Sequence, residues 1–123
     1  TKEYQIHKES HLNIKGQDYV LPQALSNIQL SNWLSAGTLS KSHLNLDDGQ
    51  IQSNLLHIEA SAEYCSHKHK GFEITLVLEG SFEDQTSCYK QGDFVVSTKT
   101  DSQQIKTDTG CLCLTVAKTV VHQ

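Results

Sequence analysis

Two histidines and one glutamate, His67, His69 and Glu73, stand close together in the run SHKHKGFEITLVLEG. In an extended strand, side chains two residues apart point to the same face. The three residues share parity, so a strand bent near Gly71 would aim all of them into one cavity. Two imidazoles and one carboxylate are ligands for a borderline divalent metal such as zinc, iron, nickel or manganese. The spacing therefore predicts a metal site.

A purely structural role is the alternative for these residues. A single histidine on a strand is usually a surface residue or a satisfied core residue. His67 and His69, two residues apart and joined by Glu73 on the same face, together favour a metal site more strongly than any one of the three residues does. The apolar run that follows, EITLVLEG, would hold Glu73 at the mouth of a buried cavity. A carboxylate there is costly unless a metal or hydrogen bonds compensate its charge.

The elements that must position these residues are predicted to be strands. From Trp33 onward, strand-like runs alternate with turn signals at a spacing of roughly 8–12 residues, which is typical of a sandwich or barrel. The runs are WLSAGTLSKSHLNL, QIQSNLLHIE, EITLVLEG, FVVS, QQIKT and CLCLTVAK. A chain of 123 residues favours one domain. We expect an all-β barrel over residues 31–123 and a linker or edge arm over residues 1–30, with a short helix or turn after Pro22.

Composition excludes several classes of function. The formal net charge of −4 and the scatter of ten lysines argue against a nucleic-acid partner. The chain has no arginine, which weakens the case for an enzyme that grips a small acidic substrate. No apolar stretch reaches the length of a membrane span, and no signal peptide is visible. We expect a cytoplasmic protein with reduced thiols and, since the sequence holds no methionine, one domain of a longer protein.

The cysteines and the remaining histidines allow two interpretations. Cys111 and Cys113 alternate with leucines on one predicted strand, and small core hydrophobes are favoured over a redox-sensing pair. Cys65 shares parity with His67, so it either lines the cavity mouth or packs in the domain. Trp33 is expected to anchor the core. The histidines without partner spacing are taken as surface or strand residues: His7, His11, His43, His57 and His122.

These motifs resemble those of the cupin superfamily. The first cupin motif is matched by His67, His69, Glu73 and Gly80, whereas its opening glycine falls on Ser61. In the second motif only the opening glycine is matched, by Gly92. The proline, glycine and histidine of that motif fall on Thr98, Thr100 and Gln103. The resemblance implies a small cupin, that is, a double-stranded β-helix or jelly-roll barrel.

A narrower resemblance covers about residues 33–118. The segments HKHKGFEITLVLEGSFEDQTSCYKQGDF and GCLCLTVA resemble the C-terminal cupin domain of ChrR-type anti-sigma factors. In that family an N-terminal domain binds an extracytoplasmic-function sigma factor and carries its own zinc through a His-x-x-x-Cys-x-x-Cys element. This sequence lacks that element. The resemblance implies the sensory half of such a protein, a homodimer that regulates transcription in response to oxidative stress.

The resemblance also implies a ligand set for zinc. Three family ligands carry over as His67, His69 and Glu73, and the fourth, a histidine, falls on Gln103, or on Gln104 if the register slips by one. A glutamine oxygen is a weaker ligand than imidazole, so we expect zinc with reduced affinity. Iron, nickel or manganese would also suit these ligands. A further alternative is a site without metal, in which Gln103 forms a hydrogen bond with Glu73.

Two other functions compete with the sensor. A metal-dependent, dioxygenase-like cupin enzyme would use open positions on iron, but the absence of arginine makes an enzyme the less favoured interpretation, and no residue is assigned a catalytic role. A metal-free barrel that binds a small ligand is the other alternative, and the loss of the second motif favours it.

Overall fold

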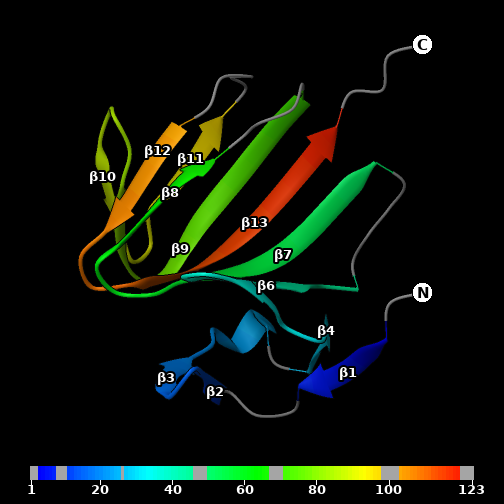
Figure 1. Cartoon of the computed structure of the whole chain (residues 1–123). Helices are drawn as coiled ribbons and strands as arrows, with labels where there is room; N and C mark the ends of the chain where they lie inside the picture. The colour runs from blue at the N-terminus through cyan, green and yellow to red at the C-terminus, as the bar shows by residue number, and fades with distance from the viewer. Residues whose placement is uncertain are drawn as a thin grey trace.

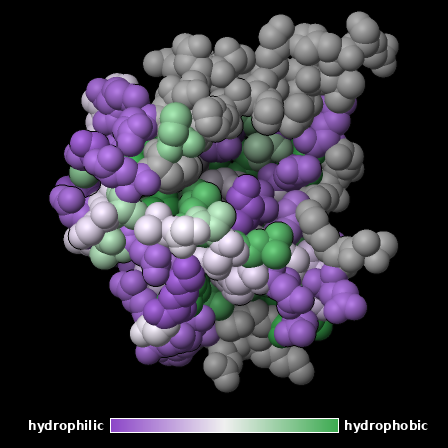
Figure 2. All heavy atoms as spheres, in the orientation of Figure 1, coloured by the Kyte–Doolittle hydropathy of each residue, from purple (hydrophilic) through white to green (hydrophobic). Residues whose placement is uncertain are grey.

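The computed structural model describes residues 3–7, 11–25, 27–45, 50–66, 71–97 and 103–119, and most of these residues lie in strands. In this part of the chain the helical structure is the 3-10 turn η1, Gln23–Leu25, which follows Pro22. No helix among these residues has the length and apolarity that crossing a bilayer requires. Figure 2 shows a face on which hydrophilic residues predominate and hydrophobic ones form small scattered groups.

The strands follow one another through short turns. In chain order they are β1 (Tyr4–His7), β2 (His11–Ile14), β3 (Gln17–Val20), β4 (Ile28–Ser31), β5 (Leu34–Ala36), β6 (Leu39–His43), β7 (Ile51–Ile58), β8 (Ala62–Ser66), β9 (Gly71–Glu83), β10 (Cys88–Lys90), β11 (Phe94–Ser97), β12 (Gln103–Thr107) and β13 (Cys111–Thr119).

One nine-stranded antiparallel sheet forms the body of the molecule. Its order is β5-β6-β7-β13-β9-β12-β8, and β10 and β11 also pair with β9. The sheet curls into a half-barrel, with β7 and β13 on one side and β8, β10 and β12 on the other (Figure 1). The predicted all-β class is thereby confirmed. Each strand-like run predicted from Trp33 onward overlaps at least one of these strands.

The inside of the half-barrel holds one apolar core. Strand alternation turns every second side chain inward, and strands from both sides of the curl contribute. Its buried members are Ile58, Ala62, Val77, Phe82, Ile105, Cys111 and Cys113. This inner core holds the two sides of the sheet together.

A second core lies on the outer face of the same sheet. Here Leu55, Leu78 and Leu112, from three adjacent strands, meet the N-terminal part of the chain. Residues 1–30, predicted as a linker or edge arm, supply five buried side chains to this outer core: Leu12, Ile14, Tyr19, Leu21 and Leu30. Trp33 is half-buried against the same cluster. The β2–β3 hairpin and β4 therefore form a layer beneath the sheet, as Figure 1 shows.

A polar pair is buried within the outer core. The Tyr19 hydroxyl lies 2.8 Å from His57 Nε2, and the two rings meet edge to face. Burial, aided by Cys111 and Glu79, raises the pKa of Tyr19 to about 12. Burial also lowers the pKa of His57. His57, which the sequence analysis took as a surface or strand residue, therefore ties the hairpin to the sheet as a neutral imidazole.

Gly80 allows a close approach of two chain segments. Its φ of +80° lies in the left-handed region, and a Cβ there would stand 2.1 Å from the Gly110 carbonyl oxygen. Gly92 has a similar φ of +91° but nothing within 4 Å of its Cβ position. An alanine at Gly92 would therefore pay only the cost of the left-handed backbone, whereas an alanine at Gly80 would also clash with Gly110.

We expect Gly80→Ala to destabilise the fold much more than Gly92→Ala. The left-handed conformation alone costs a non-glycine residue about 1–2 kcal/mol, and overpacking adds about 1–3 kcal/mol. Urea denaturation followed by tryptophan fluorescence measures both variants. Equal losses of unfolding free energy in the two variants would show that the backbone at Gly110 can shift to accommodate the added methyl group at no measurable cost.

The buried His57 predicts a specific pH dependence of stability. In the unfolded chain the imidazole has its ordinary pKa of 6.5, and in the folded chain its pKa is lower. Below about pH 6.5 the unfolded state therefore binds a proton that the folded state does not, and stability falls as pH falls. His57→Gln keeps a polar group near Tyr19 and should show a smaller loss between about pH 8 and about pH 5. Thermal denaturation of both proteins, with His11→Gln as control, gives the difference, and identical slopes for His57→Gln and the parent would refute the assignment.

Candidate metal centre

The predicted ligands divide between described and undescribed parts of the chain. Glu73 lies in β9, and Gln103 opens β12, where its backbone is described. His67 and His69 lie outside the described residues. The chain leaves β8 at Ser66 and enters β9 at Gly71, so the motif spans the connection between two strands. The predicted bent strand thus includes residues 67–70, which lie outside the described residues.

Glu73 lies on the inner face of the half-barrel. Its Cα pairs with Ala117 of β13 on one side and with Ser97 of β11 on the other. Glu73 is two residues from Thr75 and four from Val77, which belongs to the inner core, so all three share the inner face. The side chain is half-buried, and the Thr75 hydroxyl donates to Glu73 Oε1 over 3.4 Å. Glu73 therefore shares the inner face with the core residue Val77 and lies beside the Thr75 hydroxyl.

The strand ends around Glu73 gather at one end of the barrel. The Cα of Gln103 pairs with Ser66, the residue immediately before His67. Ser97, the last residue of β11, pairs with Glu73 itself. Figure 1 shows β8 and β11 ending, and β9 and β12 beginning, at this same end. The topology therefore brings the backbone at Gln103 and the end of β8 to the end of the barrel that carries Glu73.

The described residues test only part of the ligand set. Among them, no group of three or more His, Cys, Asp or Glu side chains converges as a metal site requires. One of the four predicted ligand side chains, that of Glu73, falls in the described part. Its inward direction and half-buried position suit an acidic ligand, since a carboxylate is a hard oxygen donor that zinc and iron both accept.

Gln104, the alternative to Gln103, has a different environment. Its side-chain amide lies 3.4 Å from Glu63 Oε2, and Gln104 pairs with the exposed Cys65. The neighbouring Ile105 is buried in the inner core. Gln104, Glu63 and Cys65 therefore lie on the outer face, which favours Gln103 over Gln104 and does not favour Cys65 as a lining residue of the cavity.

The inner face becomes polar toward the end that carries Glu73. Cys113 and Val77 pair within the apolar core, whereas the next inward pair along the same strands is Thr115 with Thr75. Asn54 of β7 pairs with Thr115 and extends this polar row. Among the residues of this polar row, sequence reasoning singled out Glu73 and missed Thr75. The position of Thr75 two residues after Glu73 in EITLVLEG was a signal that both side chains face the same side of the strand.

The two buried cysteines belong to the inner core. Cys111 and Cys113 are each at most 1 % exposed, and the Cys113 thiol donates to Cys111 Sγ over 4.0 Å. This hydrogen bond and burial raise the pKa of Cys113. A thiol that resists ionisation is a poor nucleophile, so the arrangement supports packing rather than redox sensing.

Ser61 occupies the position at which the first cupin motif opens with glycine. Its φ of +61° lies in the left-handed region, where glycine is favoured. Its backbone amide donates to the Asp108 carbonyl oxygen over 3.1 Å. The motif glycine is thus explained by a turn before β8, and this chain makes the same turn with a serine.

Comparison with known proteins identifies this architecture. Residues 23–121 match the ChrR cupin-like domain family. Over 71 residues the chain is 31% identical to the anti-sigma-E factor ChrR of Cereibacter sphaeroides, covering 58% of this chain and 33% of that protein. The structure of Rhodobacter sphaeroides SigE in complex with the anti-sigma ChrR matches with a TM-score of 0.63 and 27% identity, over 70% of this chain and 48% of that one.

A cupin of lower identity shows the fold alone. The RmlC-like cupin of Shewanella frigidimarina matches with a TM-score of 0.62 and 17% identity, over 72% of this chain and 84% of that one. By contrast, the chain spans a third to a half of the length of the ChrR proteins that it matches.

The burial of the thiols predicts their reactivity. In the native protein we expect a thiol reagent such as Ellman's reagent to modify the exposed Cys65 and Cys88 and to leave Cys111 and Cys113 unmodified. Denaturant should release the two protected thiols. Cys65→Ser and Cys88→Ser serve as controls that assign the fast reaction. Rapid modification of all four cysteines, or a peroxide-induced disulfide between Cys111 and Cys113 in the folded protein, would contradict the core assignment.

Proposed function

Because the chain belongs to the ChrR cupin-like domain family, we propose that it is the metal-binding regulatory domain of an anti-sigma factor. Its metal is zinc, held by His67, His69 and Glu73, and Gln103 takes the place of the fourth ligand. Its partner is an extracytoplasmic-function sigma factor, engaged through a further domain, and its signal is oxidative stress. The domain works in the cytoplasm as a homodimer.

The position of Glu73 is the observation that carries this proposal. Its half-buried carboxylate lies on the inner face of the barrel, beside the Thr75 hydroxyl. The strands that lead into residues 67–70 and out of residues 98–102 meet the barrel at the same end. An acidic ligand on a rigid central strand, with flanking connections at its side, is the arrangement that a metal site needs.

A bound zinc ion would supply positive charge that stabilises the Glu73 carboxylate and would link this strand to the β8–β9 connection. The chain's own residues define what such a link would control. Glu73 is fixed by pairing on both sides, with Ala117 and Ser97. The histidines precede β9 and Gln103 begins β12, so loss of the link would act on connections at the barrel end rather than on the core. Such a local change is the kind of two-state element that a regulatory domain requires.

The sigma-factor partner is supported by the relatives. The matched complex contains SigE bound to ChrR, and the curated relative is an anti-sigma-E factor. The present chain corresponds to a part of those proteins. In our proposal this part senses the signal, and a further domain binds the sigma factor.

We expect protein purified without chelator to contain zinc at close to one ion per chain by elemental analysis. Glu73→Gln keeps the size of the side chain but removes the anionic ligand, and it should lower zinc affinity at least about ten-fold. Gln103→His should raise the affinity by restoring an imidazole. Glu63→Gln is the matched control because this glutamate lies on the outer face with Gln104 and Lys106. A competition titration with a chromogenic chelator measures all four proteins.

Three outcomes would count against the proposal. Metal below about 0.2 ion per chain in fresh protein would favour the metal-free alternative. Unchanged zinc affinity in Glu73→Gln would show that Glu73 is not a zinc ligand. Oxygen consumption by the iron-loaded protein with candidate substrates would favour the enzyme over the regulatory domain.

A further inference from the structure

The strand β11 leaves two large apolar side chains in solvent. Phe94 is 67 % exposed and Val96 is 55 % exposed. Val95, between them, packs against the inner core, so strand alternation places Phe94 and Val96 on the outer face of the sheet. Within the described part of the chain β11 pairs with β9 and with no other strand, and Figure 1 shows it beside β9. One edge and one face of β11 are therefore open.

The exposed Phe94 continues an apolar row that the N-terminal layer covers only in part. In the register of the sheet, Phe94 lies opposite Leu76, and Leu76 pairs with Leu114. Leu114 pairs in turn with Leu55. Leu55 is fully buried in the outer core, and Leu76 and Leu114 are partly buried against that core. The cover of the outer face thus decreases along this row and is least at β11.

A second row lies beside the first. Val96 lies opposite Ile74, and Ile74 pairs with Val116. Phe72, two residues before Ile74 on the same face, is 38 % exposed. Phe72 and Phe94 together leave about 200 Å² of aromatic surface in solvent, since one such side chain presents about 150–250 Å². Patches of a few hundred Å² mark interaction sites, but a standard stable interface buries about 800 Å² per partner. The area therefore suits a reversible association.

The backbone of β11 presents hydrogen-bonding groups at the open edge. The Val77 amide donates to the Asp93 carbonyl oxygen over 2.9 Å, so Asp93 directs this carbonyl at β9. In an antiparallel ladder every second residue bonds to the same neighbouring strand. Val95 therefore bonds toward β9, whereas Phe94 and Val96 direct their N–H and C=O groups to the open edge. The two exposed apolar residues also carry the backbone groups that β9 does not use.

The other edges of this sheet are less suited to pairing. Proteins commonly protect an edge with charged residues or by keeping the strand short. The edge strand β8 carries Glu63, and β10 carries Lys90. The edge strand β5 has three residues, and its exposed Leu34 pairs with Lys41. By contrast, β11 carries neither a charge nor a proline.

We propose that two copies of this chain associate by antiparallel pairing of their β11 edges around a two-fold axis at Val95. In this register Phe94 exchanges both backbone hydrogen bonds with Val96 of the second copy, and symmetry repeats this exchange. The side chains of Phe94 and Val96 then pack across the axis on the outer face, as an aromatic and β-branched pair. A second copy is the fitting occupant because this edge is complementary to itself, as a two-fold interface requires.

This assignment rests on the homodimer of the proposed function and names its interface. Pairing joins the two sheets into one and gives β11 a neighbour on both edges. Ser97, the last residue of β11, pairs with Glu73. The association therefore holds the strand that lies directly beside the candidate metal centre.

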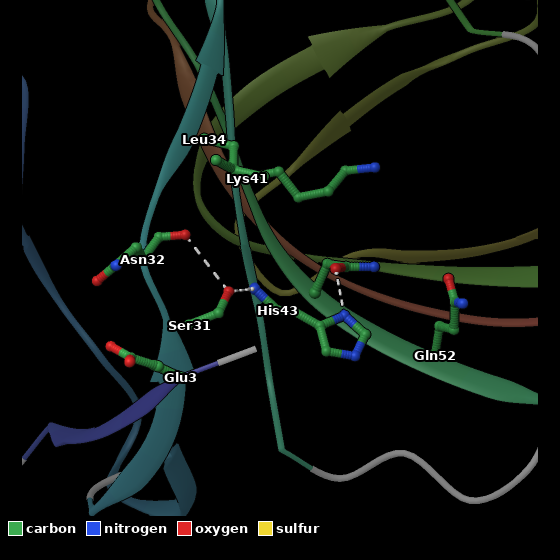
Figure 3. A pocket seen from close by; sticks show the side chains of 8 residues that line it. Glu3, Ser31, Asn32, Leu34, Lys41, His43 and Gln52 are labelled. Carbon is green, nitrogen blue, oxygen red and sulfur yellow. Dashed lines mark hydrogen bonds between the residues drawn. The ribbon is translucent and has the colours of Figure 1, made fainter. Parts of the chain in front are cut away.

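Sedimentation velocity of the whole chain tests the association. From about 1 μM to about 300 μM protein, the range expected for an interface of below-standard area, we expect a change from one chain to two. Val96→Lys should weaken the dimer at least about ten-fold, because symmetry places two charges in the apolar contact. Phe94→Thr removes the aromatic surface without adding charge and should also weaken it at least about ten-fold. Leu34→Lys is the matched control, since Leu34 is 76 % exposed on the edge strand β5, at the groove shown in Figure 3.

Amide hydrogen exchange tests the register. The amides of Phe94 and Val96 should exchange at least about two-fold more slowly at the highest concentration than at the lowest, and the amide of Val95, which faces β9, should change less. A single chain at every concentration would overturn the interface and the homodimer, while zinc content is measured separately. Dimers that survive both β11 variants, or that only Leu34→Lys disrupts, would overturn the interface alone.

Discussion

The pairing of β9 with β13 decides which side chains enter the barrel and which face the N-terminal layer. These are the most extensive neighbours in the sheet, paired from Gly71 and Thr119 to Gly80 and Cys111. A slip of one residue would exchange the two faces and turn Glu73 away from the interior. Strand alternation places Leu112 in the outer core and Cys113 in the inner one, and the register shift between them passes over Leu78 of β9, which joins the outer core. Both cores and the position of Glu73 depend on this single register.

The N-terminal segment has two roles that arise from the same contacts. Its β2–β3 hairpin covers the outer face, where Tyr19 and His57 form a hydrogen bond inside an otherwise apolar layer. Its β4 strand is held to the edge of the sheet by Ser31, and a groove of about 490 Å³, lined by Ser31 and His43 among others, opens beside that contact. A polar contact in such a layer fixes the position of the hairpin more strictly than leucines alone would, because an unpaired hydroxyl or imidazole would be costly there. The segment thus completes the fold and forms one wall of this groove.

Sequence patterns predicted those features of the fold that depend on residues close together in the chain. Alternating apolar residues marked the long strands, and the apolar run EITLVLEG, which begins at Glu73, lies within β9. The strands before residue 31 have four residues each, and their pairing depends on the leucines of the distant outer core. His57 also lacked a signal, because its partner Tyr19 is 38 positions away. The groove could not be anticipated for the same reason: it exists only where Ser31 meets His43.

The distribution of thiols limits how such a domain could respond to oxidants. Cys111 and Cys113 are enclosed in the inner core, and the pKa of Cys113 is raised, so an oxidant reaches them only if the barrel opens. Cys65 is exposed, and its neighbour Ser66 pairs with Gln103 at the end of the barrel where Glu73 lies. An oxidation that begins in the folded protein must therefore start at the exposed Cys65 or Cys88, or at the proposed metal ligands, and not in the core. Accessible thiols and core thiols are therefore different cysteines of the same small domain.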